Sequence, residues 1–427
     1  MQKIAFFLNN HSMLNIDYSG ILEGNPGVAG SEYEFLLIPY LLEIRDNDID
    51  PYLCVNFSGN FPHKNVEYTN DLKEACDFCM KEGINQIVVD IKYFNHNILK
   101  NYENRLSVLI WAHNNVSYNL LKLFSRLTYI KRIINCGREE MELYRDNIAT
   151  LKSTYIYNIF PFKSLSYYKK RMLSKDNHNV VFMGSITKEK GFHILARAWK
   201  KVLAKVPDAE LFVVGSGRLY NSKARLGKYN IAEEKYEEMF MPYLVDSKEQ
   251  ILPSVHFLGL LGDEKYDILG NCKVAVPNPT GFSECLPITS IEMQLMGCSI
   301  TTINHSAYLD TVFNQDFLFS SESKLSKYLI KRLTTKADDY QLLYNFVTKK
   351  FGIDGNIDRW EYVIKSNSQI LEPISNNHNQ LKSLKDFLLK AKIKYSFLNI
   401  LPPIELFYWY PMLIKRKYYE ILFKFKL

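Results

Sequence analysis

Strand-like apolar runs alternate with helical patterns along most of this chain, and this alternation restricts the fold more than any other feature. The strands predicted in the first half are IAFFLN (4–9), PYLCVN (51–56), QIVVD (86–90) and SVLIWAH (107–113). Helical patterns at 32–44 and 71–82 lie between them. Strands that alternate with helices form parallel sheets with helices on both faces. The pattern therefore predicts an α/β fold.

The alternation restarts after residue 178. The strands predicted there are NVVFMGS (179–185), AELFVVGSG (209–217), SVHFLG (254–259), CKVAVPN (272–278) and SITTIN (299–304), with a helix at 191–205. A chain of 427 residues is too long for one ordinary core. We therefore predict two doubly wound domains joined near 160–178, which is polar and irregular. Ligands bind such sheets at the carboxyl ends of the strands, so a cleft between the domains is the expected site.

Two segments depart from the regular alternation. Pro39 falls inside the helical pattern of 32–44 and should kink or split that helix. Residues 218–253, rich in Lys, Tyr and Glu, form a long insertion before the strand at 254–259 and are predicted to be a mobile flap.

Cysteine usage and the first residues indicate the compartment. Seven cysteines at irregular spacings do not form a disulfide framework. Cys76 and Cys79 form a CxxC, but charged residues surround them and no second pair stands at zinc spacing. The chain starts directly in a predicted strand, without a signal-peptide pattern. A reducing, cytoplasmic setting is expected.

The segment Pro277–Gly297, PNPTGFSECLPITSIEMQLMG, is the strongest site candidate. Glu284 lies in a Gly/Pro/Ser-rich loop, and Glu292 lies in the helical pattern that follows. Pro287 suits the first helical position and Gly297 suits the stop. Leu286 would then be the cap, and it has no side-chain oxygen to occupy the free N–H groups of the first turn. Those donors could therefore bind a phosphate.

Three further residues lie where a ligand could be reached. Lys190 precedes Gly191 at the start of the helix at 191–205 and could reach a diphosphate, although a loop lysine alone is usually just solvated. In NPGVAGSEYE, Gly30 allows close approach of a ligand or simply makes a turn, and Ser31 with Glu34 has the capping-box pattern. His113 follows a buried strand and is either a core histidine or a catalytic one.

Together these motifs resemble the retaining family-4 glycosyltransferases, which have the GT-B fold. The E-x7-E pair of Glu284 and Glu292, the loop from Gly184 to the Lys190–Gly191 dipeptide, VVGSG and HFLG occur in the family's order. The early glycine loop and the histidine of WAHN also match. The resemblance covers roughly residues 1–375, and GNPGVAGSEYE with NPTGFSE looks like a bacterial branch that works on surface polysaccharides.

The resemblance implies the architecture. It implies an N-terminal Rossmann-like acceptor-side domain over 1–165 and a C-terminal Rossmann-like nucleotide-sugar-binding domain over 178–350. Helices at 351–375 would cross back towards the first domain. A basic, aromatic tail would follow at 381–427.

The resemblance also implies a role for each site residue. Glu284 would bind hydroxyls of the donor sugar, Glu292 the ribose, and Lys190 the diphosphate. His113 would touch the transferred sugar. The other residues implied to line the donor site are Gly30, Ser185, Gly215, Cys285, Leu286 and Ile288, with Leu260 or Leu261 beside the base. If both glutamates were helical, they would lie about 12 Å apart along the axis and roughly 80° around it. A loop glutamate on the sugar and a helical one on the ribose therefore fits better.

The sequence departs from the family pattern at three positions. Ser185 stands where an arginine usually follows the strand-end glycine, and Lys188 or Arg218 are possible substitutes for that cation. Pro287 stands where a glycine or cysteine is usual, and Ala29 where a glycine is common.

The basic charge lies in the tail. Residues 381–427 hold ten Lys/Arg and three Asp/Glu, which accounts for the whole net charge of +7. Leu381, Leu384, Leu388 and Ala391 fall at helical spacing among lysines. Prolines and Glu405 in the apolar stretch that follows argue against a membrane-spanning helix. Contact with an anionic membrane surface is expected, with packing onto the first domain as the alternative.

These features predict a metal-independent, retaining glycosyltransferase without a cofactor. It would move a sugar from a nucleotide diphosphate-sugar to a glycan acceptor, lipid-linked and at the cytoplasmic membrane face, in capsule or O-antigen synthesis. No nucleic-acid partner is expected. The alternatives are a degenerate binding subunit that partners an active transferase, or another enzyme on the same scaffold, a nucleotide-sugar epimerase or a phosphorylase.

Overall fold

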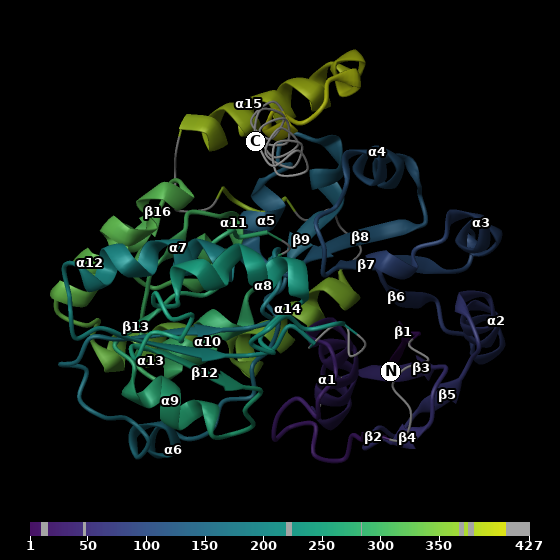
Figure 1. Cartoon of the computed structure of the whole chain (residues 1–427). Helices are drawn as coiled ribbons and strands as arrows, with labels where there is room; N and C mark the ends of the chain where they lie inside the picture. Colours follow the sequence, from purple (N-terminus) through teal and green to yellow (C-terminus); the bar gives the residue numbers. More distant parts are fainter. Residues whose placement is uncertain are drawn as a thin grey trace. The chain divides into compact units, whose positions relative to one another are not determined.

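The computed structural model describes residues 1–9, 16–45, 48–218, 224–282, 284–366, 371–374 and 380–406. The chain forms two compact units (Figure 1). Unit 1 comprises Met1–Ile159 and the chain from Ile353 onward, and unit 2 comprises Phe160–Gly352. The irregular stretch at 160–178 therefore lies in unit 2, and the helix that follows residue 352 returns to unit 1.

Unit 1 is built on a seven-stranded parallel sheet in the order β5-β3-β1-β6-β7-β8-β9. Its strands are β1 (Gln2–Leu8), β3 (Ile49–Val55), β5 (Val66–Tyr68), β6 (Gln86–Asp90), β7 (Ser107–Ala112), β8 (Ile130–Asn135) and β9 (Ser153–Tyr155), with a separate pair of β2 (Ile16–Asp17) and β4 (Gly59–Asn60). Its helices are α1 (Gly30–Ile44), α2 (Leu72–Glu82), α3 (His96–Leu99), α4 (Tyr118–Arg126), α5 (Arg138–Glu142), α14 (Ile353–Lys365) and α15 (Gln380–Lys394).

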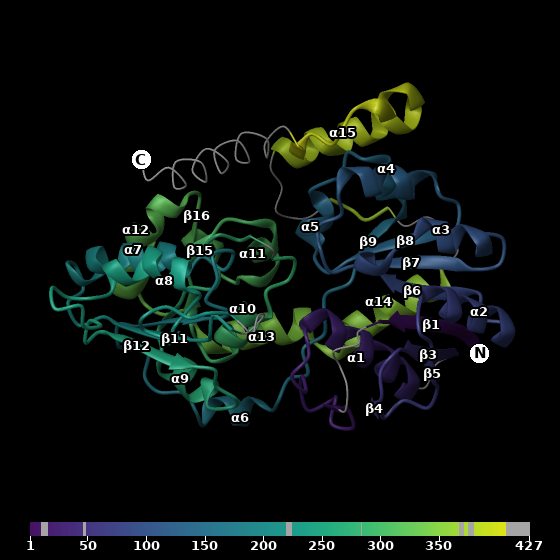
Figure 2. The same cartoon turned by 45° about the vertical axis from the view of Figure 1, so that its right-hand side comes forward.

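Helices cover both faces of this sheet. Residues of α2, α3 and α4 join the strands in one core cluster, and these helices follow one another along the same side in Figure 2. On the opposite side, α14 packs against α1. There Trp360 of α14 contacts Phe6 of β1 and Trp111 of β7, with ring centroids 5.8 and 4.6 Å apart. The segment after residue 352 thus completes the core of unit 1.

Unit 2 is built on a five-stranded parallel sheet in the order β12-β11-β10-β13-β14. Its strands are β10 (Asn179–Met183), β11 (Glu210–Val214), β12 (Val255–Gly259), β13 (Val274–Ala275) and β14 (Ser299–Ile300), with a separate pair of β15 (Thr302–Ile303) and β16 (Leu318–Phe319). Its helices are α6 (Leu165–Lys169), α7 (Phe192–Leu203), α8 (Glu234–Phe240), α9 (Lys265–Asn271), α10 (Ile288–Leu295), α11 (Ser306–Thr311), α12 (Leu325–Thr334) and α13 (Tyr340–Phe351).

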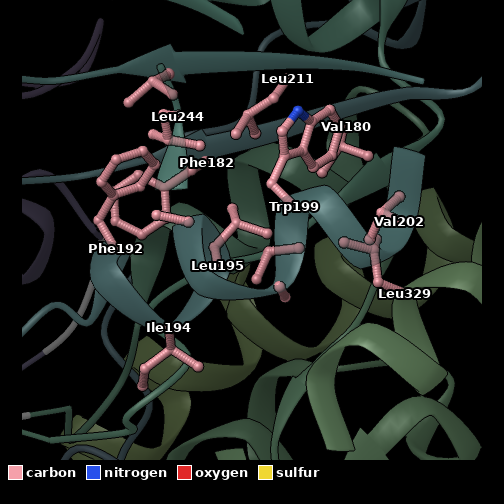
Figure 3. Packing of buried hydrophobic residues seen from close by; sticks show 14 of the residues in the cluster. Val180, Phe182, Phe192, Ile194, Leu195, Trp199, Val202, Leu211, Leu244 and Leu329 are labelled. Carbon is pink, nitrogen blue, oxygen red and sulfur yellow. The ribbon is translucent and has the colours of Figure 1, made fainter. Parts of the chain in front are cut away.

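The core of unit 2 lies between the sheet and α7. Phe192, Leu195, Trp199 and Val202, which the sequence places at helical spacing, are all fully buried. They pack against residues of the sheet and against α8 and α12. Figure 3 shows Trp199 beside Val180 and Leu211. The other face carries α9, α10 and α13 (Figure 1). Both units are thus doubly wound, as predicted.

Two predictions about unit 2 are wrong. The segment SITTIN does not form one strand, because β14 continues the main sheet and β15 pairs with β16 instead. The insertion at 218–253 is not a mobile flap in its described part. Its helix α8 buries Tyr236 and Phe240 in the core, and Met241 and Leu244 follow them. Because Lys and Glu residues surround these buried aromatic residues, the sequence of α8 does not show a clear amphipathic pattern. Residues 219–223 lie outside the described part.

Helix α1 also differs from its prediction. It continues through Pro39 without a split, from Gly30 to Ile44. The predicted capping box of Ser31 and Glu34 is wrong, because the helix starts two residues earlier than that box requires. Glu32 occupies the third helical position and accepts the Ala29 N–H at 3.2 Å. Glu34 is instead fully buried, where its Oε2 accepts the Ile159 N–H at 3.1 Å.

Glycines end the first two strands of unit 2. Gly184 follows β10 with φ of 150°, and Gly215 follows β11 with φ of 141°, a region that favours glycine. The Gly184 N–H donates to Val214 O at 2.9 Å, so sheet pairing continues past the strands. A Cβ on Gly215 would overlap the carbonyl oxygen of Gly184. The segments after β10 and β11 can therefore approach this closely only because residue 215 is a glycine.

We expect Gly215→Ala to destabilise unit 2 by about 2–3 kcal/mol, because it combines backbone strain with a backbone clash. Gly24→Ala is the matched control, since Gly24 has φ of 149° and nothing within 4 Å of an added Cβ. Scanning calorimetry of both variants measures the difference. Equal loss of stability in the two variants would contradict the close-contact explanation.

Glu34 predicts a pH dependence of stability. Burial raises the pKa of its carboxyl well above the ordinary value. The native state therefore holds the proton to higher pH than the unfolded state, and stability falls as pH rises above the unfolded pKa by about 1.4 kcal/mol per unit until the native pKa is reached. Glu34→Gln should remove this decline, whereas Glu23→Gln, at an exposed position, should keep it. Urea titrations over a pH series test this, and parallel profiles for wild type and Glu34→Gln would refute it.

Candidate functional site

The candidate site lies where the strand order of unit 2 reverses. The chain runs from β10 outward to β11 and β12, then returns to the other side of β10 as β13 and β14. At such a switch point the loops after the two central strands diverge and leave a ligand-binding crevice. The loop after β10 carries Lys190, and the loop after β13 carries Glu284. The two strongest sequence candidates therefore leave adjacent strands at the same edge.

The two loops are fastened to each other. Gly191 has φ of 71° and caps α7, and an added Cβ there would lie 2.6 Å from Cγ2 of Thr280. The Thr280 hydroxyl oxygen lies 2.5 Å from the carbonyl oxygen of Glu189 and 2.6 Å from Asn278 Oδ1, two acceptors that share its single proton, and it accepts the Phe282 N–H at 2.9 Å. Thr280 is thus a positioning residue that the sequence analysis missed. Its spacing from Lys190 gives no sequence signal.

Lys190 and Glu284 form an ion pair. The Lys190 Nζ lies 2.5 Å from Glu284 Oε1, and both side chains are largely shielded, at 20% and 11% exposure. Asn278 Nδ2 donates to the same carboxylate oxygen at 2.9 Å and to the Phe282 carbonyl at 3.0 Å. Asn278 therefore fixes the turn that presents Glu284. It lies within the predicted segment but was not named as a site residue.

Helix α10 begins one residue later than predicted. Pro287 is the N-cap rather than the first helical residue, with φ of −73° and ψ of 97°, and it provides no side-chain cap. The stop is confirmed, because Gly297 adopts φ of 72°. Its N–H donates to Gln294 O at 3.0 Å and that of Cys298 to Met293 O at 3.0 Å, which is a Schellman motif. The uncapped N-terminus of α10 follows directly on the Glu284 loop, as the phosphate hypothesis requires.

Glu292 is held separately from Glu284. It lies in α10, nearly buried, and its Oε1 is 2.6 Å from Lys265 Nζ and 3.2 Å from the Tyr266 hydroxyl. Burial and then the Glu292 charge raise the pKa of Tyr266, so this hydroxyl stays protonated and donates. Lys265 and Tyr266 begin α9, and sequence reasoning named neither. A lysine on one helix and a glutamate on another have no fixed sequence spacing.

Ser185, which stands where the family usually has an arginine, lies inside the protein. Ser185 is buried, and its hydroxyl lies 3.5 Å from the Ser216 carbonyl. Of the two candidate substitutes, Lys188 is exposed, and the Arg218 Nε donates to Ala224 O at 3.1 Å. Among the described residues, neither forms an ion pair with Glu284 as Lys190 does. Compensation for the arginine therefore stays a prediction.

The remaining donor-site predictions lie on the loops around this edge of the sheet. Gly215 follows β11, and Leu260, 61% exposed, follows β12. Leu286 is buried, Cys285 is half-buried, and Ile288 is the first residue of α10. The roles that the resemblance implies for them stay predictions. Among the residues that the structure describes, no three His, Cys, Asp or Glu side chains gather as metal ligands would.

His113 lies in unit 1, just beyond the carboxyl end of β7. Its Nδ1 is 3.2 Å from Asp90 Oδ2, at the end of the neighbouring strand β6. Trp111 and Phe35 flank the imidazole, with ring centroids 4.5 and 5.9 Å away. Its Nε2 is buried and makes no hydrogen bond with the described residues. Asp90 thus orients the imidazole, and Nε2 has no hydrogen-bond partner among the described residues. A core histidine that only stabilises the fold would have both ring nitrogens hydrogen-bonded.

Unit 1 has its own switch point between β1 and β6. Gly30, predicted to approach the donor, is the first residue of α1. In the same turn, Glu32 lies 3.6 Å from Nζ of Lys92, which follows β6. Neither Glu32 nor Lys92 stands out in the sequence, since each has the pattern of an ordinary surface charge. Unit 1 therefore places a Lys–Glu pair at its switch point as unit 2 does.

Comparison with known proteins agrees with this geometry. Residues 177–334 match the family model described as glycosyl transferases group 1. An uncharacterized glycosyltransferase of Haemophilus influenzae is 22% identical over 269 residues, which are 60% of this chain and 69% of that protein. These similarities support a glycosyltransferase, and the match covers the whole candidate site of unit 2.

Solved structures show the fold. The chain is similar to Anabaena HepE in complex with UDP and glucose, at 14% identity and a TM-score of 0.55, over 85% of this chain and 99% of that one. It is also similar to a glycosyltransferase from Rickettsia africae, at 13% identity and a TM-score of 0.56, over 86% and 99% of the two chains. These likenesses confirm the predicted GT-B fold class.

Thr280 gives a test of the fastening between the two loops. Thr280→Val keeps the shape of the side chain but removes the hydroxyl that contacts the Glu189 carbonyl, Asn278 Oδ1 and the Phe282 N–H, which should cost about 1–2 kcal/mol of stability. Thr334→Val is the control, because the Thr334 hydroxyl bonds only within its own helix. Calorimetric melting of both variants measures the difference. A Thr280→Val melt that matches that of Thr334→Val would show that this bond does not hold the loops.

Proposed function

We propose that the chain is a metal-independent, retaining glycosyltransferase that uses a nucleotide diphosphate-sugar donor. The observation that carries the proposal is the meeting of Lys190 and Glu284 at the switch point of unit 2, next to the N-terminus of α10. A diphosphate needs fixed positive charge and free donors, and this edge offers a lysine and the amides of an uncapped helix. The UDP and glucose in the HepE structure support a donor of this class.

The two glutamates have different proposed tasks. Glu284, in the loop, would bind hydroxyls of the donor sugar, and Glu292, in α10, would bind the ribose. Their separate anchors support this division, since Asn278 and Lys190 hold the first while Lys265 and Tyr266 hold the second. Each carboxylate is thereby oriented before any ligand binds, which lowers the cost of ordering on binding. When a diphosphate binds, Lys190 would exchange part of its contact with Glu284 for phosphate oxygens.

The proposed reaction exchanges one bond at the anomeric carbon for another on the same face. The bond from this carbon to the diphosphate oxygen breaks, and a bond to the acceptor hydroxyl oxygen forms. The hydroxyl proton passes to the departing diphosphate. Lys190 and the backbone N–H groups of residues 285, 286, 288 and 289 would stabilise the negative charge that develops on that group. His113, held by Asp90, would contact the transferred sugar from the acceptor side.

We further propose a glycan acceptor, lipid-linked, at the inner face of the cell membrane, in synthesis of a capsule or O-antigen. The resemblance of GNPGVAGSEYE and NPTGFSE to surface-polysaccharide enzymes supports this, as does the basic charge after residue 381. Among the described residues, no helix has the length and apolar character to cross a bilayer. A chain that reaches a lipid-linked acceptor by surface contact needs no such helix.

Ser185 favours a second candidate, a degenerate binding subunit that partners an active transferase. The position is enclosed, and neither Lys188 nor Arg218 is bonded at the site. A second cation near the diphosphate would then be absent, and turnover would suffer more than binding. A chain that binds a nucleotide sugar yet transfers nothing, even with membrane lipid as acceptor, would support this candidate.

Glu284→Gln is the decisive variant for the transferase. We expect it to keep the fold but reduce transfer by about a hundredfold or more, because the amide cannot replace the carboxylate at the reacting sugar. The assay follows release of nucleoside diphosphate from a panel of nucleotide sugars with membrane lipid extract as acceptor. Glu264→Gln, at an exposed glutamate before α9, is the control.

The product of the same assay tests the stereochemistry. Proton NMR of the new linkage should show the anomeric configuration of the donor. An inverted product would refute the retaining mechanism, and full activity of Glu284→Gln would refute the assigned site.

A further inference from the structure

Helix α15 turns its lysines inward. Lys382, Lys385 and Lys392 are 6%, 3% and 3% exposed, and they form the face of the helix that packs on unit 1. In both views α15 lies over α5, which belongs to the same unit (Figures 1 and 2). Lysines rarely occupy the buried face of an amphipathic helix, so each must have a specific partner there.

The partners are acidic side chains and carbonyls of unit 1. Lys382 Nζ lies 2.5 Å from Glu139 Oε2. Lys385 pairs with Glu405 and donates to the carbonyls of Glu142 and Leu143. These contacts occupy the two ammonium groups within the protein.

Lys392 completes the same face. Its Nζ lies 3.6 Å from Asp146 Oδ2 and donates to the Leu401 carbonyl at 3.1 Å, and desolvation lowers its pKa. Three of the five lysines in α15 therefore bind acidic side chains and carbonyls of unit 1 and so hold the helix in place. They are not available to lipid phosphates, and these three lysines follow the alternative prediction, in which this part of the tail packs onto the first domain.

Apolar side chains face outward instead. Leu384 and Phe387 of α15 are 42% and 66% exposed. Phe397 and Ile400 are 72% and 76% exposed in the short 3₁₀ helix η7 (Ser396–Ile400), which packs against α15. The predicted stripe through Leu384 therefore does not form the buried face. We call these four residues the outer apolar face.

The charge around the outer apolar face indicates what it meets. Lys390 and Lys394 lie on the outward side of α15; the Lys390 side chain is 73% exposed and its Nζ lies 2.8 Å from Asp386 Oδ2. The sequence from residue 407 to the end adds five Lys/Arg and one Asp/Glu among many aromatic residues. Exposed apolar groups of this size beside net positive charge match a bilayer with anionic headgroups, which offers an apolar boundary under negative charge.

We propose that the outer apolar face inserts into the headgroup boundary of an anionic bilayer, while the inward lysines clamp α15 to unit 1. Insertion of large apolar groups then supplies most of the attachment, and the exposed cations select anionic lipid. The inference rests on the proposed membrane location but not on the transfer reaction. Because apolar insertion is not screened by salt, attachment should persist at high ionic strength.

The test is sedimentation of the full chain with vesicles. Vesicles of phosphatidylcholine with an equal amount of phosphatidylglycerol are compared with phosphatidylcholine alone, at low and high salt and without any nucleotide sugar. Wild type should bind the anionic vesicles and keep much of that binding at high salt. Phe387→Ser/Phe397→Ser/Ile400→Ser should reduce the partition coefficient by roughly tenfold or more.

The control removes exposed apolar groups elsewhere. Leu173→Ser/Leu342→Ser, at 62% and 53% exposure, should bind vesicles like wild type. Melting curves and nucleotide binding of each variant separate loss of this face from loss of the fold or of the donor site.

Three outcomes would overturn the proposal. The triple variant could bind vesicles as wild type does. Wild type could be a dimer by light scattering that the triple variant abolishes, without vesicle binding, so that a second copy covers the face. Wild type could fail to bind while the triple variant melts earlier, so that residues after 406 cover it. None of these results bears on sugar transfer, which the Glu284→Gln assay decides separately.

Discussion

The parallel pairing of β10 with both β11 and β13 is the constraint on which the rest of unit 2 depends. Parallel strands send their loops to one edge, and the reversal of strand order between β10 and β13 separates the loops there. Gly215 allows the segments after β10 and β11 to come into contact. The Thr280 hydroxyl joins the loop after β13 to the loop after β10. Lys190 and Glu284 are thereby placed within 2.5 Å of each other by the backbone topology.

Ion pairs then hold the two acidic side chains of the site in place. Two acidic side chains of one short segment are each held by a lysine from a different part of the chain, Glu284 by Lys190 and Glu292 by Lys265. Leaving either carboxylate unpaired in so enclosed a place would be costly. Buried charges are paired in α15 as well, where two lysines form ion pairs with Glu139 and Asp146. Paired charges thus fix positions in both units, and they leave apolar groups to form the outer surface of α15.

Periodicity in the sequence predicted the strands β1, β3, β6, β7, β10, β11 and β12 within a few residues, because buried parallel strands are short continuous apolar runs. The glycine that follows the helical pattern predicted the stop at Gly297. Sequence patterns failed for α8, whose buried Tyr236 and Phe240 stand among charged residues, and for the capping of α1, where Glu32 rather than Glu34 faces the free N–H. The pairs of Asp90 with His113 and Lys265 with Glu292 arise from sheet order, which no local pattern reports.

Calorimetric titration of the purified chain with uridine, guanosine, adenosine and thymidine diphosphates is the direct test of the diphosphate site, with Lys190→Ala and Lys201→Ala titrated alongside. We expect one nucleotide to bind, Lys190→Ala to weaken its binding by about ten- to a hundredfold, and Lys201→Ala to change it little. Lys201 is an exposed lysine in the last turn of α7, so it controls for loss of charge alone. Absence of binding for all four nucleotides, or equal weakening in both variants, would contradict a diphosphate site at the switch point of unit 2.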